Sequence, residues 1–271
     1  MATIKIRKKD DQSQLGTAVN IQQYTTSDNR KIITIIAEYH NYNFNCLNNK
    51  EISQYCLDEV NNNQNCRILL EYSKYDNPKT IGSKTINTTY NKLVKYKKEK
   101  HLIPIDYRTL FLKAKGQSDL YDIDWQKQGY SSQLIIKRFI EPFYQHAKQI
   151  FTIDSKQYNY QTYLNIKKFI TKDIAPQFDF VLNILNTKTF KLEKLQTELK
   201  LLWNKVMDIG ILITILKKDK IDEFILVAGL RHCQNLKRML NTYFKDDFRF
   251  VHEQERTEQS CIKLSQISDK L

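Results

Sequence analysis

Two histidines follow apolar segments that end in a similar way, although they lie far apart in the chain. Residues 32–37 run into Glu38 and His40, and residues 223–228 run into a glycine turn and His232. Imidazole nitrogens bind transition metals and take up protons near neutral pH. If both segments are parallel strands of one sheet, their carboxyl ends meet at the edge where open α/β sheets bind ligands. We therefore expect the two histidines to share a pocket.

Two further segments would bring charged side chains to the same edge. Residues 66–70 lead to Glu71, and residues 102–105 lead to Asp106 and Arg108. Carboxylates can ligate a metal or act as a general base, and an arginine can stabilise an oxyanion. The predicted catalytic set is Glu38, His40, Glu71, Asp106, Arg108 and His232.

The segments between these strands have helical periodicity. Apolar side chains recur near helical spacing in residues 48–60 and 86–98, so residues 32–106 are predicted to alternate strand and helix. Such units favour parallel strands with right-handed crossovers. The predicted fold class is α/β, with a mostly parallel central sheet, flanking helices and a large helical insertion. After His232, residues 234–244 are expected to form a helix and residues 248–251 a last strand.

The remaining segments complete the predicted organisation of residues 1–271 as a single α/β domain. Residues 3–7 alternate as an edge strand would, and the polar stretch 8–28 is predicted to be loop. Residues 115–220 are predicted to be a helical insertion that could cap the sheet edge, and residues 254–271 to be a polar tail. Within the insertion, Pro176 should bound or kink a helix, and residues 190–216 should form one helix broken near Gly210.

The strand ends resemble motifs of a known superfamily. Ala37 to His40 is similar to a Gly-Glu-x-His motif, and Gly229 to His232 to a Gly-x-x-His motif, of the Tiki, TraB and ChaN proteins and, more distantly, the erythromycin esterases. Glu71 and Arg108 occupy the places where that superfamily carries an acidic residue and an arginine. The resemblance covers residues 30–110 and 220–255. Ala37 departs from the motif glycine, and the esterases separate glutamate and histidine more widely.

The resemblance implies an α/β fold with a site at the strand ends. Members of the superfamily include metal-dependent peptidases, proposed esterases and a haem or iron binder. We expect a hydrolase that cleaves a peptide or ester bond with an activated water. In one version, His40 and His232 with Glu38 or Glu71 hold a divalent ion (manganese, cobalt or zinc), which lowers the pKa of bound water to about 7. The remaining carboxylate would take the proton of that water.

A version without metal uses the same residues differently. His40 would be the general base, and Glu71 would hold its tautomer. In both versions Arg108 would stabilise the anionic intermediate, and Asp106 would orient the arginine. The alternatives to a hydrolase are a non-catalytic protein that uses the two histidines for haem or a metal, and an inactive scaffold or basic nucleic-acid-binding protein.

Composition bears on partners and on location. The formal net charge is +13 and the isoelectric point is near 9.3, but the lysines are dispersed, with short clusters at 95–100 and 217–220. Nucleic acid is therefore not expected as a partner, and a peptide or small-molecule substrate is. The N-terminus has no signal-peptide core, and the longest apolar run, residues 209–216, is too short to span a membrane, so a cytoplasmic protein without a membrane anchor is expected.

The chain lacks several other catalytic signatures. It has no Gly-x-Ser-x-Gly elbow, and its six glycines form no phosphate-cradling loop, which disfavours a serine hydrolase or a P-loop enzyme. The five cysteines form no Cys-x-x-Cys pair and are expected to be reduced thiols. His101, His146 and His252 are expected to have structural roles.

Overall fold

The computed structural model divides the chain into two compact units, Met1–Pro104 with Lys220–Leu271, and Ile105–Asp219. The residues that the structure describes are 14–15, 18–28, 30–38, 49–72, 83–106, 131–135, 137, 141, 145, 152, 154–186, 192–217, 220–256 and 262–263.

A six-stranded sheet forms the centre of the first unit. Its strands follow the order β6-β5-β7-β3-β2-β8. Their bounds are β2 Ala18–Thr26, β3 Ile32–Glu38, β5 Cys66–Leu70, β6 Leu102–Pro104, β7 Glu223–Gly229 and β8 Phe248–Glu255. The four strands from β6 to β3 are parallel, whereas β2 is antiparallel to both of its neighbours. This arrangement confirms the predicted α/β fold with a mostly parallel sheet.

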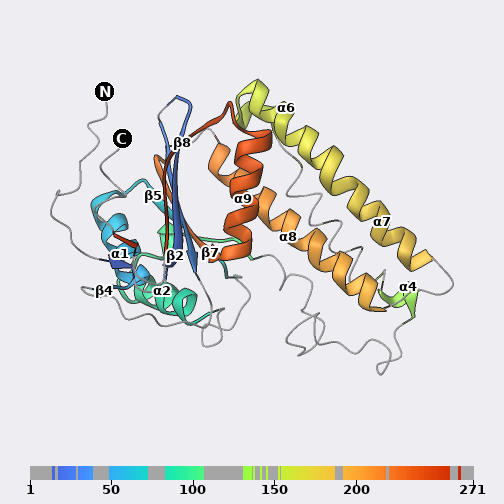
Figure 1. Cartoon of the computed structure of the whole chain (residues 1–271), viewed down its shortest axis with the longest axis horizontal. Helices are drawn as coiled ribbons and strands as arrows, with labels where there is room; N and C mark the ends of the chain where they lie inside the picture. The colour runs from blue at the N-terminus through green and yellow to red at the C-terminus, as the bar shows by residue number, and fades with distance from the viewer. Residues whose placement is uncertain are drawn as a thin grey trace. The chain divides into compact units, whose positions relative to one another are not determined.

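Helices cover both faces of this sheet (Figure 1). Helices α1 (Ile52–Asn62) and α2 (Lys84–Lys95) pack on one face, and α9 (Leu230–Tyr243) lies against β3 and β7 on the other. Because side chains alternate along a strand, Ile36 and Val227 join the α1 and α2 core while their chain neighbours face the other way. Burial on both faces explains why these strands are almost continuously apolar.

Strand β2 corrects the prediction that residues 8–28 form a loop. Ala18–Thr26 is a buried strand between β3 and β8. The polar side chains of β2 suggested an exposed loop. They are buried in the strand instead, because hydrogen bonds satisfy them there. Gln22 donates to the side chains of Asn20 and Glu253, and Gln23 donates to Thr34.

A small second sheet joins distant parts of the chain. It has the order β4-β1-β9, with β1 at Gln14–Leu15, β4 at Asn49–Lys50 and β9 at Ile262–Lys263. Strand β9 therefore comes from the segment 254–271, for which a tail was predicted, and β8 also extends into that segment. The predicted strand 3–7 lies outside the described residues.

The second unit is helical in its described part. Its elements are α4 Ser132–Ile135, η3 Ser155–Gln157, α6 Tyr160–Phe169, the π-helical turn η4 Ile170–Ile174, α7 Ala175–Asn186 and α8 Leu192–Leu216. The π turn comes just before Pro176, which has no N–H and would clash with the preceding turn of a regular α-helix. Lys205 of α8 donates to the backbone carbonyl of Asp173 within this turn (3.1 Å).

Helix α8 runs without a break through Gly210, contrary to the prediction. Gly210 is buried, as are Ile209 and Ile211 on either side of it. A glycine inside a helix costs only about 1 kcal/mol relative to alanine, and burying large apolar side chains outweighs that cost.

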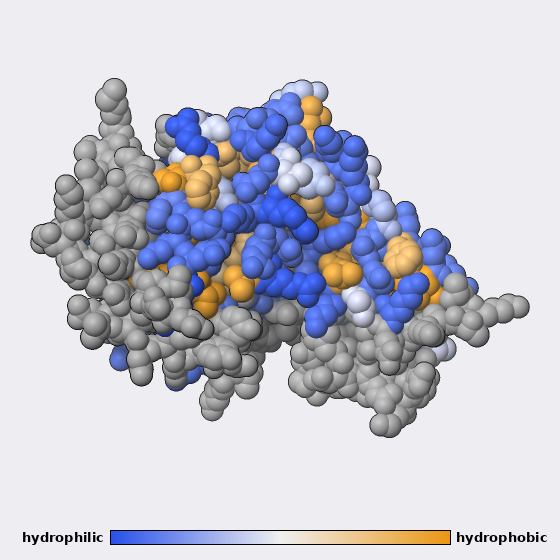
Figure 2. Space-filling view, in the orientation of Figure 1, coloured by the Kyte–Doolittle hydropathy of each residue, from blue (hydrophilic) through white to orange (hydrophobic). Residues whose placement is uncertain are grey.

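The surface of the described residues is mostly hydrophilic on the face shown in Figure 2, where apolar side chains form small separate patches. In the part of the chain that the structure describes, no helix combines the length and apolar character needed to cross a bilayer.

Candidate functional site

The end of β7 is the centre of the predicted site. Strand β7 lies between β3 and β5, so two neighbouring strands deliver their last residues beside it. Glu38 is level with Gly229, and Leu70, just before Glu71, is level with Val227. Strands in a sheet are about 4.8 Å apart, so the backbones bearing the two glutamates lie about 10 Å apart on either side of β7.

Glu71 is held at the N-terminus of α9. Its Oε2 accepts a hydrogen bond from the backbone N–H of Gly229, the residue that caps this helix (2.7 Å). The backbone N–H of Glu71 itself donates to the carbonyl of Val227 (3.2 Å). A helix N-terminus presents unpaired N–H groups and a partial positive charge, both of which favour a carboxylate. Glu71 as a whole is only 5% exposed.

The other oxygen of Glu71 faces a histidine. Oε1 lies 3.7 Å from Nε2 of His232, the third residue of α9, which is also buried. This distance exceeds that of a direct N–H···O hydrogen bond, and it allows an ion pair when the imidazole is protonated. It is also close to the separation of about 3.4 Å expected for two donors on one tetrahedral zinc ion. The spacing of Glu71 and His232 is thus compatible both with an ion pair and with two ligands of one ion.

Glu38 lies on the opposite face of the sheet, beside α2. Its Oε1 accepts a hydrogen bond from the hydroxyl of Ser83, and this hydroxyl accepts from the N–H of Ile86 as the N-cap of α2. Glu38 is 1% exposed. Ser83 was not among the predicted site residues. The only signal that pointed to it was a serine directly before a helix, which is a capping pattern rather than a catalytic one.

The remaining predicted residues are placed less fully. His40 and Arg108 lie outside the described residues. Asp106 is buried two residues after β6 and falls in the second unit. Among the described residues, no group of three or more metal-ligating side chains occurs. The structure therefore brings Glu71 and His232 together, with Glu38 on the other side of β7.

The buried cysteines of the first unit are packing residues. Cys56, Cys66 and Cys233 are buried and form no disulfide. Burial raises the pKa of the Cys56 and Cys66 thiols, so both stay protonated at neutral pH. Cys233 follows His232, but its sulfur points back to the backbone carbonyls of Ile36 and Ala228 (3.8 and 3.6 Å).

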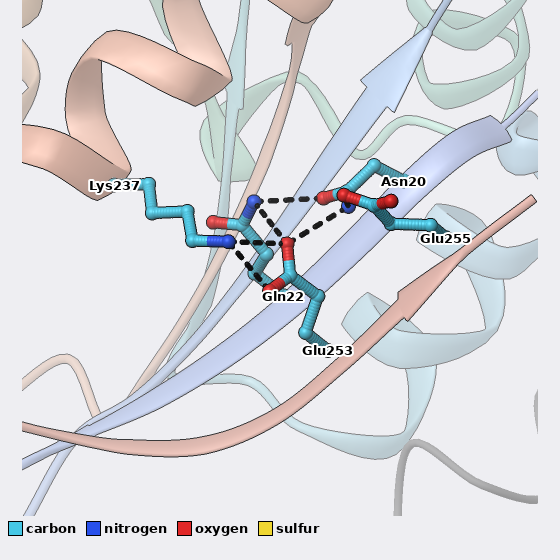
Figure 3. Close-up of polar contacts among 5 residues, drawn as sticks. All are labelled: Asn20, Gln22, Lys237, Glu253 and Glu255. Atoms are coloured by element: carbon cyan, nitrogen blue, oxygen red, sulfur yellow. Dashed lines mark hydrogen bonds and ion pairs between the residues drawn. The ribbon is translucent and has the colours of Figure 1, made fainter.

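A polar network fixes α9, the helix that carries His232, to strands β2 and β8 (Figure 3). The ammonium of Lys237 contacts both carboxylate oxygens of Glu253 on β8 (2.7 and 2.5 Å). Asn20 and Gln22 of β2 donate to the same carboxylate, and Asn20 also reaches Glu255. These contacts join the middle of α9 to β2 and β8.

The network should make stability depend on pH. Burial alone would raise the pKa of Glu253, but hydrogen bonds from Lys237, Asn20 and Gln22 and the lysine charge outweigh it and lower this pKa below 4.5. A lowered carboxyl pKa stabilises the folded state above about pH 4.5, and that contribution disappears as the pH falls through the folded-state pKa.

We expect Lys237→Met to lower the free energy of unfolding by about 1 kcal/mol at pH 7, because it removes a partly exposed ion pair. The deficit should shrink as the pH falls below 4.5, when Glu253 takes up its proton in wild type as well. Urea denaturation across this range measures it, with exposed Lys245→Met as the control. An equal deficit at every pH would contradict this account of Glu253.

Comparisons with known proteins found no relative: the chain matches no protein-family model, no curated protein and no solved structure.

Proposed function

We propose that the chain is a hydrolase that cleaves a peptide or ester bond with a water activated at the end of β7. The observation that carries the proposal is the double engagement of Glu71, with one oxygen on the N–H of Gly229 and the other 3.7 Å from His232. A buried carboxylate oriented by a backbone donor is preorganised, so it needs little rearrangement during a reaction. The strand-end motifs that resemble those of the Tiki, TraB and ChaN superfamily support the same proposal.

In this proposal, Glu71 and His232 would hold a divalent ion. His40, which belongs to the motif that resembles Gly-Glu-x-His, would be a further ligand. Such an ion supplies a water that ionises near neutral pH. Glu38 would accept the proton of that water from the other side of β7, where Ser83 holds its carboxylate at the N-terminus of α2. In the metal-free version of the proposal, His40 takes the proton instead.

The first experiment is a screen of wild-type protein against aryl esters and short peptides, with and without added manganese, cobalt or zinc. We expect turnover of at least one class, and we expect His232→Ala to lower kcat/KM by about 100-fold or more, as loss of an acid-base or ligand group does. The matched control is His252→Ala, which removes a histidine from β8, at a position paired with Gln23 of β2. Equal losses in both variants would contradict the assignment of His232.

A further inference from the structure

Lysines surround an exposed tyrosine where α2 ends. Five lysines and one glutamate occur within nine residues, at Lys92, Lys95, Lys97, Lys98, Glu99 and Lys100. We call these five lysines the lysine cluster. Tyr96, in the middle of the cluster, is 51% exposed. Neither the cluster nor Tyr96 takes part in the proposed hydrolytic site.

The backbone of the cluster turns sharply at a lysine. Lys97 has a φ of 55°, in the left-handed region that glycine normally occupies after a helix. The N–H of Lys97 bonds to the carbonyl of Val94, and the N–H of Lys98 bonds to that of Leu93, which is the bonding pattern of a Schellman motif. A lysine at this position is less favourable than glycine because its Cβ crowds the backbone. A cation thus occupies a position where the local fold favours glycine. Residues in such strained conformations cluster at binding sites.

The charge of the cluster is largely uncompensated. Lys92 lies 3.6 Å from Glu51, and the ammonium of Lys95 lies over the ring of Tyr96 (5.8 Å). Neither Lys97 nor Lys98 forms an ion pair with any described residue, and the same holds for Lys95 and Lys100. Cations do stabilise the carboxyl end of a helix, but that effect is limited to the last turn and does not require an exposed ring.

A buried histidine next to the cluster experiences the same positive charge. His101 is fully buried, and its Nδ1 lies 2.9 Å from the carbonyl of Cys66, so this nitrogen carries the proton and donates it. Burial lowers the pKa of His101, and the charges of Arg67, Lys100 and Lys98 lower it further. The imidazole therefore stays neutral beside a region of positive potential.

We propose that the lysine cluster and Tyr96 form a binding site for single-stranded nucleic acid. The lysines would contact successive phosphates, and Tyr96 would stack on an unpaired base, since bases stack on aromatic side chains without regard to sequence. A base inside a duplex cannot reach such a ring, so the exposed tyrosine favours a single strand over a double one. This revises the sequence-based expectation against nucleic acid, which rested on the dispersal of the lysines along the chain.

The test is the fluorescence anisotropy of a labelled oligothymidylate, with a duplex of equal length and phosphatidylserine vesicles as competitors. We expect Tyr96→Ala to weaken binding about fivefold or more, through the lost stacking, and Tyr96→Phe to bind as wild type does. Lys97→Gly should weaken binding and make the logarithm of affinity less salt-dependent by about 0.7 per decade of salt, the share of one phosphate contact.

Lys97→Gly also separates binding from folding. Because glycine suits the left-handed turn, this variant should unfold at a temperature about 2 °C higher than wild type while binding more weakly. Lys245→Ala, which removes an exposed lysine from the turn between α9 and β8, should leave binding unchanged. Unaltered binding in Lys97→Gly or Tyr96→Ala, equal affinity for the duplex, or displacement by vesicles alone would each overturn the proposal.

Discussion

Glu71→Ala is expected to lower the free energy of unfolding by about 2 kcal/mol, whereas Glu71→Gln should retain most of the stability and lose hydrolytic activity. Alanine leaves the buried N–H of Gly229 without the acceptor it has at 2.7 Å, and an unsatisfied buried donor costs about 1 to 3 kcal/mol. Glutamine still offers a carbonyl oxygen to this N–H. It lacks the negative charge that faces His232, so activation of the water should fall by about 100-fold or more.

The two variants are compared by urea denaturation and by kcat/KM on the best substrate of the screen. Glu99→Gln is the matched control, because Glu99 is exposed and lies far along the chain from the end of β7. A Glu71→Gln variant with the full wild-type rate would show that Glu71 only caps α9. A Glu71→Ala variant as stable as wild type would show that the cap itself contributes little.

Wild-type protein is expected to bind about one equivalent of zinc, manganese or cobalt, and His232→Ala to bind it at least about 100-fold more weakly. The argument rests on the 3.7 Å between Glu71 Oε1 and His232 Nε2, which suits two ligands of one ion better than a hydrogen bond. Calorimetric titration of chelator-treated protein measures both affinity and stoichiometry.

The control for ion binding is again His252→Ala, which removes one imidazole from β8. It should bind the ion as wild type does. If wild type and His232→Ala bind equally well, the ion is held elsewhere. If neither binds any of the three ions, the metal version of the mechanism is wrong and the version with a histidine base remains.

The parallel strands could be predicted because their sequences are dominated by burial. Residues 32–37 and 223–228 are apolar throughout, as expected for strands covered on both faces. Strand β2 could not be predicted in the same way, because its buried Asn20 and Gln22 hydrogen-bond to Glu253 of β8, more than 200 residues later. Likewise, Gly210 was expected to break a helix, but its neighbours Ile209 and Ile211 are packed in the core and the helix continues.

The edge that carries the site could be predicted, but the pairs within it could not. The carboxyl ends of parallel strands meet at one edge whatever the strand order, so Glu38, Glu71 and His232 were expected there. Which side chains touch depends on β7 lying between β3 and β5, and on the face from which each side chain leaves the sheet. The metal-free version of the sequence-based mechanism paired Glu71 with His40, which lies outside the described residues, and the structure places Glu71 beside His232.

The central claim is that Glu71 and His232 act as one unit on the attacking water. A double-mutant cycle on hydrolysis tests it most directly, with kcat/KM measured for wild type, Glu71→Gln, His232→Ala and the combined variant. Residues that act as a unit are strongly non-additive, so the account predicts that the combined variant is no slower than the slower single variant. The account would be contradicted if the combined loss equalled the product of the two single losses. It would also be contradicted if the wild-type protein hydrolysed no substrate faster than buffer does.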